Sequence, residues 1–311
     1  MVWLLIALAA AAVVAMFGRR LWTLLRSEWR AILAQARADV YRRQWEAKNP
    51  IGEPIDEEEA AEMIRWYRSL ARPALILTPA ADPGADTGMR LGGAPWFADG
   101  EQWPVDGSGR QLEFVAQLDF ARLPRLDDFP DAGILRFFIG RNDIYGVNFD
   151  APEQGDIAVL WYPGPREGGR TDPALSLTDD DGSPFQDERV RVEGKAFEAA
   201  LASDLPDSSS CEVQARLDGQ SRRPGIDELE DELFEIAESR PYGHRIGGHP
   251  TFTQADFREP GKHDEFDRVL LALTSDESIM WGDVGEAVFM IRAADLARRD
   301  FSRIAFYWDC H

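Results

Sequence analysis

The chain carries the phrase Leu91-Gly92-Gly93-Ala94-Pro95-Trp96-Phe97 and, in its second half, a related phrase, Ile246-Gly247-Gly248-His249-Pro250-Thr251-Phe252. An apolar run follows each phrase, and a glycine-led apolar run comes after it. Runs of this length that are rich in branched and aromatic residues are typical of buried strands. The repeated order predicts a single domain built from two halves that an internal duplication relates.

Strand patterns outnumber helix patterns in the rest of the chain. Asp56, with Glu59 three residues later, predicts the start of a helix that runs to about Leu70, where Arg72-Pro73 ends it. We expect strands at 74–78, 112–119, 134–139, 157–162, 189–192, 269–273, 287–291 and 304–308, helices at 225–239 and 293–298, and surface loops at 163–183 and 203–225. Because long βαβ alternation is absent, the expected fold class is α+β, mainly antiparallel β-sheet.

The first 25 residues predict a membrane anchor. Val2 to Phe17 are all apolar, and with Leu21 to Leu25 the stretch approaches the length of a spanning helix. A cleaved signal peptide fits less well, because no positive charge precedes the apolar run. The arginines follow it, from Arg19 onward, so the positive-inside rule places the rest of the chain in the cytoplasm. We therefore expect a single-pass protein of the inner (cytoplasmic) membrane.

Three parts follow from this pattern: the anchor (1–25), a juxtamembrane helix and linker (26–55), and an α+β domain (56–311). An apolar stripe at helical spacing, from Trp22 to Ala36, continues beyond the anchor. It is explained either by a helix that lies against lipid headgroups or by a short coiled coil that dimerises the protein. The sequence leaves the oligomeric state open.

Charge and composition narrow the classes of ligand. The chain has a net charge of −21, although its first 50 residues carry eight Lys/Arg and three Asp/Glu. An acidic domain repels nucleic acid, whose recognition requires clustered Lys/Arg. The two cysteines, Cys211 and Cys310, form no CxxC pair, so neither a disulfide framework nor a zinc site is expected. Nucleotide-binding and zinc-protease signatures are absent from the sequence, so no cofactor is expected.

Short phrases occur in a fixed order over residues 92–310. In the first half they are Gly92-Gly93-x-Pro95, Trp103-Pro104, Gln117-Leu118-Asp119, Gly133-Ile134-Leu135-x-Phe137-Phe138 and Asp143-x-Tyr145-Gly146. In the second half they are Ile246-Gly247-Gly248-x-Pro250-x-Phe252-x-Gln254-x-Asp256, Trp281-Gly282-Asp283-x-Gly285, Phe301-Ser302 and Trp308-Asp309-Cys310. This order resembles the YwqG-like family, a bacterial domain of unknown function. The chain departs from that family at Leu271-Ala272-Leu273-Thr274, where the family tends to carry Gln, and in its added anchor. The resemblance implies no catalytic residues.

The second half holds the richest cluster of polar residues: His244, His249, Gln254, Asp256, Trp281, Asp283 and Asp309. Histidine and carboxylates at turns suit a metal site or an acid/base pair. A Gly-Gly-x-Pro turn with aspartates that cap backbone N–H groups explains the same residues without a ligand. Ala94 stands in the first phrase where His249 stands in the second, so the turn itself needs no histidine. The candidate binding residues are His249, Gln254, Asp256, Trp281 and Asp283, with no catalytic residue or metal ligand assigned.

Three functions remain open from the sequence. The first, which the anchor and the negative charge favour, is a non-catalytic module that binds a protein partner at the inner face of the membrane. The second is a metal-dependent or acid/base hydrolase-like enzyme with a site near His249, Asp256 and Asp283. The third is a structural membrane-associated protein without a ligand. Function must be argued from a site, and the sequence alone establishes none.

Overall fold

The structure is a computed structural model, and it describes residues 52–178 and 181–311. The chain divides into two compact units, residues 1–55 with 222–226 and residues 56–221 with 227–311, and the sheet and the site below lie in the second unit. The expected anchor (1–25) and all but the last residues of the juxtamembrane part (26–55) fall outside the described residues. Within the described residues, no helix has both the length and the apolar character needed to cross a bilayer.

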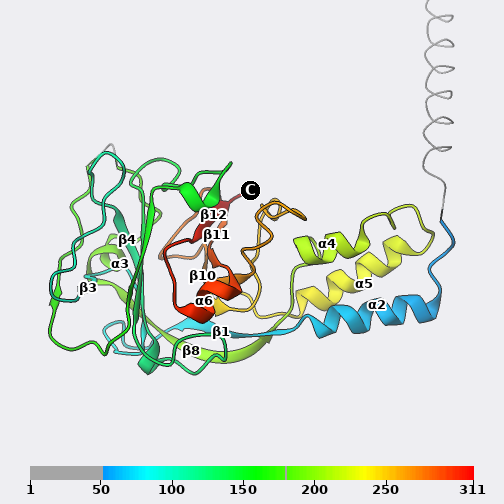
Figure 1. Cartoon of the computed structure of the whole chain (residues 1–311), viewed down its shortest axis with the longest axis horizontal. Coiled ribbons are helices and arrows are strands. Elements are labelled where there is room, and N and C mark those ends of the chain that lie inside the picture. The colour runs from blue at the N-terminus through cyan, green and yellow to red at the C-terminus, as the bar shows by residue number, and fades with distance from the viewer. Residues whose placement is uncertain (1–51, 179–180) are drawn as a thin grey trace, which may run out of the picture. The chain divides into compact units, whose positions relative to one another are not determined.

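A ten-stranded sheet, in which every neighbouring pair is antiparallel, forms most of the second unit (Figure 1). The strand order is β12-β11-β10-β9-β1-β8-β2-β4-β5-β6, and β3 and β7 form a small second sheet. The prediction of an α+β domain dominated by antiparallel sheet is confirmed. The strands are β1 (Arg72–Pro79), β2 (Met89–Leu91), β3 (Trp96–Phe97), β4 (Glu113–Asp119), β5 (Ile134–Ile139), β6 (Ile157–Tyr162), β7 (Arg170–Thr171), β8 (Lys195–Asp204), β9 (Arg245–Gly247), β10 (Arg268–Thr274), β11 (Glu286–Ile291) and β12 (Ala305–Asp309).

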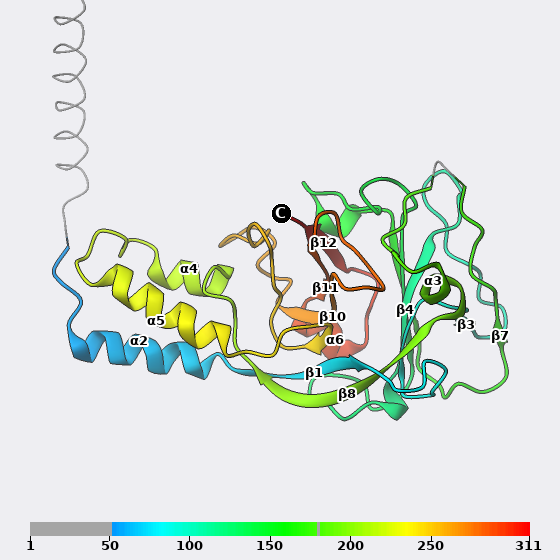
Figure 2. The same cartoon turned by 180° about the vertical axis from the view of Figure 1, so that it is seen from behind.

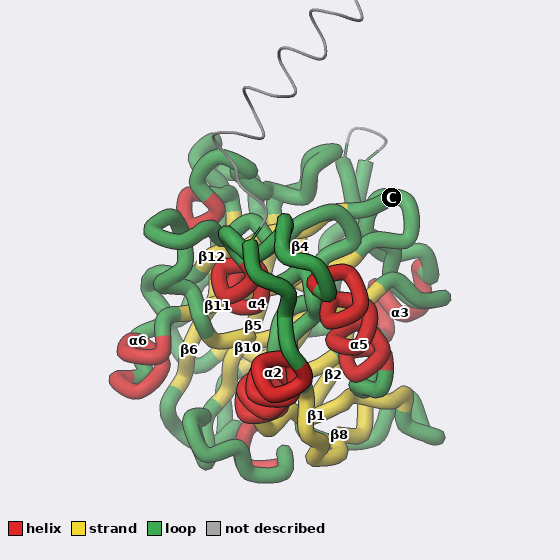
Figure 3. The backbone as a smooth tube through the Cα atoms, turned by 90° about the vertical axis from the view of Figure 1, so that its right-hand side faces the viewer, coloured by secondary structure: helices red, strands yellow, loops and turns green. Residues whose placement is uncertain are grey.

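Three helices, α2, α4 and α5, pack together beside one end of strands β1 and β8 (Figures 1 and 3). The guanidinium of Arg216 in α4 lies 5.6 Å from the ring centre of Trp66 in α2. Asp56 caps α2 by accepting a 2.8 Å hydrogen bond from the Glu59 N–H, as the sequence predicts. The helices are α2 (Glu57–Ser69), α3 (Glu188–Glu193), α4 (Cys211–Leu217), α5 (Ile226–Glu238) and α6 (Ala293–Arg298), with 3-10 turns η1 (Phe120–Arg122) and η2 (Pro152–Gln154).

The large sheet curls until its two ends face each other across the core, so that it resembles a nearly closed barrel (Figure 2). Phe137 of β5 and Phe289 of β11 stand near opposite ends of the strand order, yet their ring centres lie 4.9 Å apart. Trp161 of β6 contacts Phe301, next to β12, at 5.0 Å. One continuous core of buried side chains therefore joins strands of both halves.

The two halves of the sheet have the same strand order and the same register. The series β8-β2-β4-β5-β6 corresponds to the series β1-β9-β10-β11-β12. Arg90 of β2 pairs with Gln117 of β4, and Arg245 of β9 pairs with Ala272 at the corresponding position of β10. The β4–β5 pair and the β10–β11 pair also carry one β-bulge each, at 114–116 in β4 and at 269–271 in β10. Because a bulge is a specific local feature, two bulges at corresponding positions show a closer similarity between the halves than a shared strand order alone.

The two Gly-Gly turns also match. Gly92 and Gly93 have φ of 64° and 79°, and Gly247 and Gly248 have φ of 75° and 67°. Glycine adopts this left-handed region without steric cost, whereas other residues are strained there. The second glycine of each pair donates its N–H to the neighbouring segment, Gly93 to the Arg191 carbonyl (2.9 Å) and Gly248 to the Pro73 carbonyl (3.1 Å).

The expected strand at 189–192 is wrong, because this segment is helix α3. Asp187 caps the helix by accepting a 2.8 Å hydrogen bond from the Arg189 N–H. Glu188 and Arg191 form an i,i+3 ion pair of 2.6 Å, which a helix allows and a strand does not. Gly194, with φ of 79°, then ends the helix and leads directly into β8.

The structure also corrects the expected loop at 203–225 and contains a strand that the sequence did not predict. The expected loop at 203–225 contains helix α4, which begins after Ser210 at Cys211. The sequence also gave no expectation of strand β8, although it is the longest strand, with ten residues. Its run Lys195-Ala-Phe-Glu-Ala-Ala-Leu-Ala-Ser-Asp204 is rich in alanine, which is depleted in strands, so tertiary pairing with β1 and β2 overrides local propensity.

Replacing Gly92 by alanine should destabilise the protein more than the same change at Gly100. Both glycines have positive φ, so each variant loses roughly 1 kcal/mol or more of unfolding free energy through backbone strain. A Cβ on Gly92 would also lie 2.2 Å from the Val190 carbonyl oxygen, whereas a Cβ on Gly100 would meet nothing within 4 Å. Denaturant unfolding of both variants measures the difference, and equal losses would contradict close packing of this turn.

Candidate functional site

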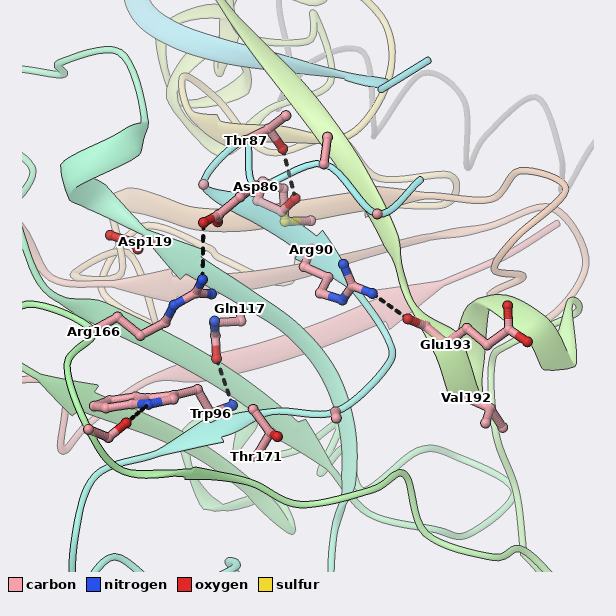
Figure 4. Close-up of a pocket in the computed structure, with 16 residues that line it drawn as sticks. Asp86, Thr87, Arg90, Trp96, Gln117, Asp119, Arg166, Thr171, Val192 and Glu193 are labelled. Carbon is pink, nitrogen blue, oxygen red and sulfur yellow. Dashed lines mark hydrogen bonds and ion pairs between the residues drawn. The ribbon is translucent and has the colours of Figure 1, made fainter. Parts of the chain in front are cut away.

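A pocket of about 540 Å³ opens beside the first Gly-Gly turn (Figure 4). Its volume is in the range of small-ligand sites. Strands β2, β3 and β4, the loop before β2, the loop around Arg166 and the end of α3 contribute its walls. The lining residues are Gly84, Ala85, Asp86, Thr87, Gly88, Met89, Arg90, Ala94, Trp96, Gln117, Asp119, Arg166, Gly168, Thr171, Val192 and Glu193.

Arg90 supplies one positive charge of the pocket. Its guanidinium donates a hydrogen bond to the Glu193 carbonyl. It lies against two glycines, since a Cβ on Gly93 or on Gly194 would come within 3.1 Å or 2.5 Å of Arg90 Nε. Partial burial, and then the nearby charge of Arg166, lower the pKa of Arg90. The group stays charged at neutral pH, because a guanidinium is not deprotonated in proteins.

The second positive charge of the pocket is held by a carboxylate. Arg166 and Asp86 form a 3.1 Å ion pair, and Arg122 contacts the same Asp86 oxygen at 3.1 Å. Asp119 pairs with Arg122 at 3.3 Å. Asp86 and Asp119 therefore have arginine partners, whereas Glu193, the third acidic residue of the lining, forms no ion pair with the described residues. Arg90 differs, because no carboxylate of the described residues lies within ion-pair distance of it.

A network of hydrogen bonds holds the side chains that form the floor of the pocket. Gln117 Oε1 accepts a 3.0 Å hydrogen bond from the Trp96 N–H, and the Trp96 indole donates to the Gly168 carbonyl at 2.9 Å. Behind Trp96, the fully buried Arg136 donates to the Trp96 carbonyl (2.9 Å) and forms a 2.6 Å ion pair with Glu101. A binding surface held by such a network loses little conformational entropy when a ligand arrives.

The second half has an arginine at the position that corresponds to Arg90, but the cavity that Gly247 and Gly248 line measures only about 100 Å³ and does not include this arginine. Arg245 is completely buried and its Nη1 lies 3.3 Å from Asp204 Oδ2, which is also completely buried. The same Asp204 oxygen accepts a 2.7 Å hydrogen bond from the His249 N–H. The second Gly-Gly turn is thus closed by a carboxylate from β8.

His249, the first of the candidate residues from the sequence, is buried against helix α2. Its Nε2 lies 2.8 Å from the Leu70 carbonyl, so this nitrogen carries the proton and donates. Its Nδ1 has no hydrogen-bond partner among the residues that the structure describes. Burial, and then the charge of Arg72, lower the pKa of His249 to about 3. The imidazole is therefore neutral at physiological pH and is a weak base.

The other four candidates lie in two places. Asp256 faces helix α4, where it accepts from the Cys211 N–H (2.9 Å) and pairs with Arg258 (2.6 Å). Gln254, Trp281 and Asp283 adjoin the last residues of the chain. Gln254 Nε2 donates to the Cys310 carbonyl (2.6 Å), the Asp283 carbonyl accepts from the His311 N–H (3.2 Å), and the Gly282 that separates Trp281 from Asp283 lies against Cys310. Trp281 is completely buried, whereas Gln254 and Asp283 are exposed.

The described residues show no group of three or more His, Cys, Asp or Glu side chains placed to hold a metal ion. Asp309 instead accepts hydrogen bonds from the Thr253 and Gln254 N–H groups, at 2.9 and 2.7 Å. The aspartates Asp256 and Asp309 thus cap backbone N–H groups, one of the two readings that the sequence allowed.

Sequence reasoning did not single out Arg90 and Arg245, although a signal was present. An arginine stands two residues before each Gly-Gly pair, in Arg90-Leu91-Gly92-Gly93 and in Arg245-Ile246-Gly247-Gly248. His249 occurs only in the second copy of the phrase, whereas the arginine occurs in both copies.

A family model described as a domain of unknown function, DUF1963, matches residues 89–310. The match spans both Gly-Gly turns and both arginines that precede them. No curated protein matches the chain.

The protonation of His249 should make the protein less stable in acid. Its pKa is about 3 when folded and 6.5 when exposed, so between these values the folded state binds fewer protons and stability falls as the pH falls. Relative to His249→Gln, the wild type should lose up to about 1.4 kcal/mol per pH unit in this window. Denaturant unfolding at several pH values measures this loss, with a change at the exposed His311 to Gln as the control. A pH-independent difference between wild type and His249→Gln would contradict a buried, neutral imidazole.

Proposed function

Because the chain belongs to a family defined as a domain of unknown function (DUF1963), we propose its function from the site: a non-catalytic module that binds a protein partner in the pocket beside Arg90. The observation that carries this proposal is a preformed pocket with a positively charged side chain, Arg90, that has no carboxylate of the described residues within ion-pair distance. Arginine, tryptophan and glutamine, which line it, are suited to recognition by hydrogen bonds and stacking.

The chemistry of the pocket favours binding over catalysis. Of its three acidic residues, Asp86 and Asp119 are engaged by Arg122 and Arg166, which suits them to holding the walls more than to taking a proton, and the third is Glu193. The pocket has no histidine or cysteine among its lining residues. The hydrolase-like alternative would need His249 as a base, and a histidine whose pKa is about 3 takes up protons poorly at neutral pH.

The relationship between the halves supports a duplicated origin. We infer that one ancestral segment gave both series of five strands, because they share turn, register and bulge position. We also propose that the matched family is the YwqG-like family, since the phrases that carry the resemblance fall within the matched residues. In this proposal the second half keeps the scaffold closed, while the first half carries the site.

A photo-crosslinking amino acid in place of Val192 should capture the partner in cells. Val192 lines the pocket and is 45% exposed, while Phe234 of α5 is 54% exposed and does not line it. We expect one discrete adduct from position 192 of the full chain and none of the same mass from position 234, as seen by denaturing gel and mass spectrometry. Identical adducts from both positions, or no adduct from position 192, would sink the proposal.

The sequence supports a location for this module. We propose that residues 1–25 anchor the protein in the inner membrane with the domain in the cytoplasm, because arginines follow the apolar run and none precedes it. Protease added to intact spheroplasts should leave the domain uncut, and lysed spheroplasts should show digestion. Cleavage of the domain in intact spheroplasts would overturn the orientation, and a mature N-terminus beyond residue 25 would overturn the anchor.

A further inference from the structure

The shared register identifies corresponding residues in the two halves. Leu91 pairs with Lys195 of β8, and Ile246 pairs with Leu75 of β1. It follows that Arg90 corresponds to Arg245 and that Ala94 corresponds to His249. β8 continues to Asp204, whereas β1 ends at Pro79, which corresponds to residue 199, so no strand residue of the first half occupies the position that Asp204 takes in the second half.

In the second half, Asp204, Arg245 and His249 form one closed unit. The Asp204 carboxylate accepts from the Arg245 guanidinium at 3.3 Å and from the His249 N–H at 2.7 Å. A Cβ on Gly248 would lie 2.4 Å from Asp204 Oδ2, so the glycine makes room for the carboxylate. A backbone N–H and a guanidinium together are a strong site for an ionised carboxylate.

In the first half, the same donors are present without the carboxylate. Arg90 and Ala94 line the pocket, together with Gly84 from the turn after β1. The Ala94 N–H donates no hydrogen bond to any residue that the structure describes. Arg90 lies close to the residue before Ala94, since a Cβ on Gly93 would lie 3.1 Å from Arg90 Nε.

Arg90 differs from the four buried arginines of the described residues in having no carboxylate partner. The four buried arginines each have a carboxylate partner: Arg136 with Glu101, Arg191 with Glu113 and Glu188, Arg245 with Asp204, and Arg258 with Asp256. Arg90, which is half-buried, has only the Glu193 carbonyl. A partly desolvated guanidinium gains most from an ionised acceptor.

We propose that the pocket binds a carboxylate group of the partner, which takes the part in the first half that Asp204 takes in the second. Arg90 and the Ala94 N–H are the donors, and Arg166 at the opposite wall adds a second positive charge (Figure 4). The inference rests on the proposed function, whose ligand class it names. The rest of the pocket, lined by Trp96, Thr171 and Val192, accommodates the residue that bears the carboxylate.

The test uses acetate as the smallest probe of this chemistry and acetamide as its neutral isostere. The full chain is labelled with [15N]alanine and kept in detergent at low salt, and the Ala94 signal is identified by its loss in Ala94→Ser. Acetate should shift the Ala94 amide proton downfield in a saturable way, and acetamide should not. No shift with acetate, an equal shift with acetamide, or a shift with inorganic phosphate alone would overturn the proposal.

Two probes of equal charge distinguish the sources of the carboxylate. N-acetyl-alanine presents a chain-terminal carboxylate, and N-acetyl-glutamic acid amide presents an acidic side chain. Tighter binding of the first than of acetate supports capture of a C-terminus, and tighter binding of the second supports capture of an acidic side chain. Binding of neither, with acetate still bound, would overturn the assignment to a protein carboxylate in favour of a free small acid.

Gly84→Asp is the decisive variant, because it places a further carboxylate of the chain itself in the wall of the pocket. A Cβ at residue 84 would meet only Asp82 Oδ1, at 3.4 Å, so the variant has room to fold. Acetate affinity should fall about tenfold or more, as it should in Arg90→Gln. Gly107→Asp, at a glycine with nothing within 4 Å, adds the same charge elsewhere and should bind acetate as the wild type does.

Wild-type acetate affinity in Gly84→Asp would overturn the proposal, as would equal losses in Gly84→Asp and Gly107→Asp. The outcome is separable from that of the proposed function. An adduct from position 192 without an acetate response keeps the binding module and removes its carboxylate chemistry. An acetate response without an adduct keeps the carboxylate site and removes the protein partner.

Discussion

The pairing of β1 with β8 is the interaction on which the rest of the structure depends. Eight residue pairs, from Arg72 opposite Asp204 to Pro79 opposite Phe197, join the two halves into one sheet. On their outer edges β1 pairs with β9 and β8 pairs with β2, so both Gly-Gly turns are built onto this central ladder. Because of this pairing, Asp204, the last residue of β8, contacts Arg245 and His249 at the Gly-Gly turn of the other series of strands. The halves are therefore alike in backbone and unlike in charge.

Closure of the curled sheet follows from side chains at corresponding positions. Phe137 lies opposite Ala116 of β4, and Phe289 lies opposite the corresponding Leu271 of β10, so the two phenylalanines are equivalent in the register. They meet each other at 4.9 Å in the core. A contact between equivalent residues is expected where two related halves face each other about a local two-fold axis. Their aromatic packing, with the burial of both rings, stabilises the closed arrangement.

The sequence predicted the fold well where local pattern and tertiary role agree. Apolar runs predicted β4, β5, β10 and β11, which are buried on both faces, and the half-buried β6. Asp56 predicted the start of α2, because N-capping leaves a direct mark in the sequence. β8 escaped prediction since its alanines take strand form only through pairing with β1 and β2. The site escaped for a related reason. Arg90 is distinguished from Arg245 by Asp204 on a distant strand, and no local pattern contains that information.

The proposed binding of an acid by an acidic protein depends on two electrostatic interactions, a long-range repulsion by the net charge and a short-range attraction inside the pocket. The net charge of −21 repels an anionic partner at distances beyond a Debye length, which is about 8 Å at physiological ionic strength. Inside the pocket, Arg90 and the Ala94 N–H act at hydrogen-bond distance, where screening by salt is weak. Salt therefore raises the association rate by reducing the repulsion and changes the bound contacts much less. In this proposal a carboxylate is bound only where both donors are met at once, so the pocket, and not the negative surface, selects this partner over other acidic proteins.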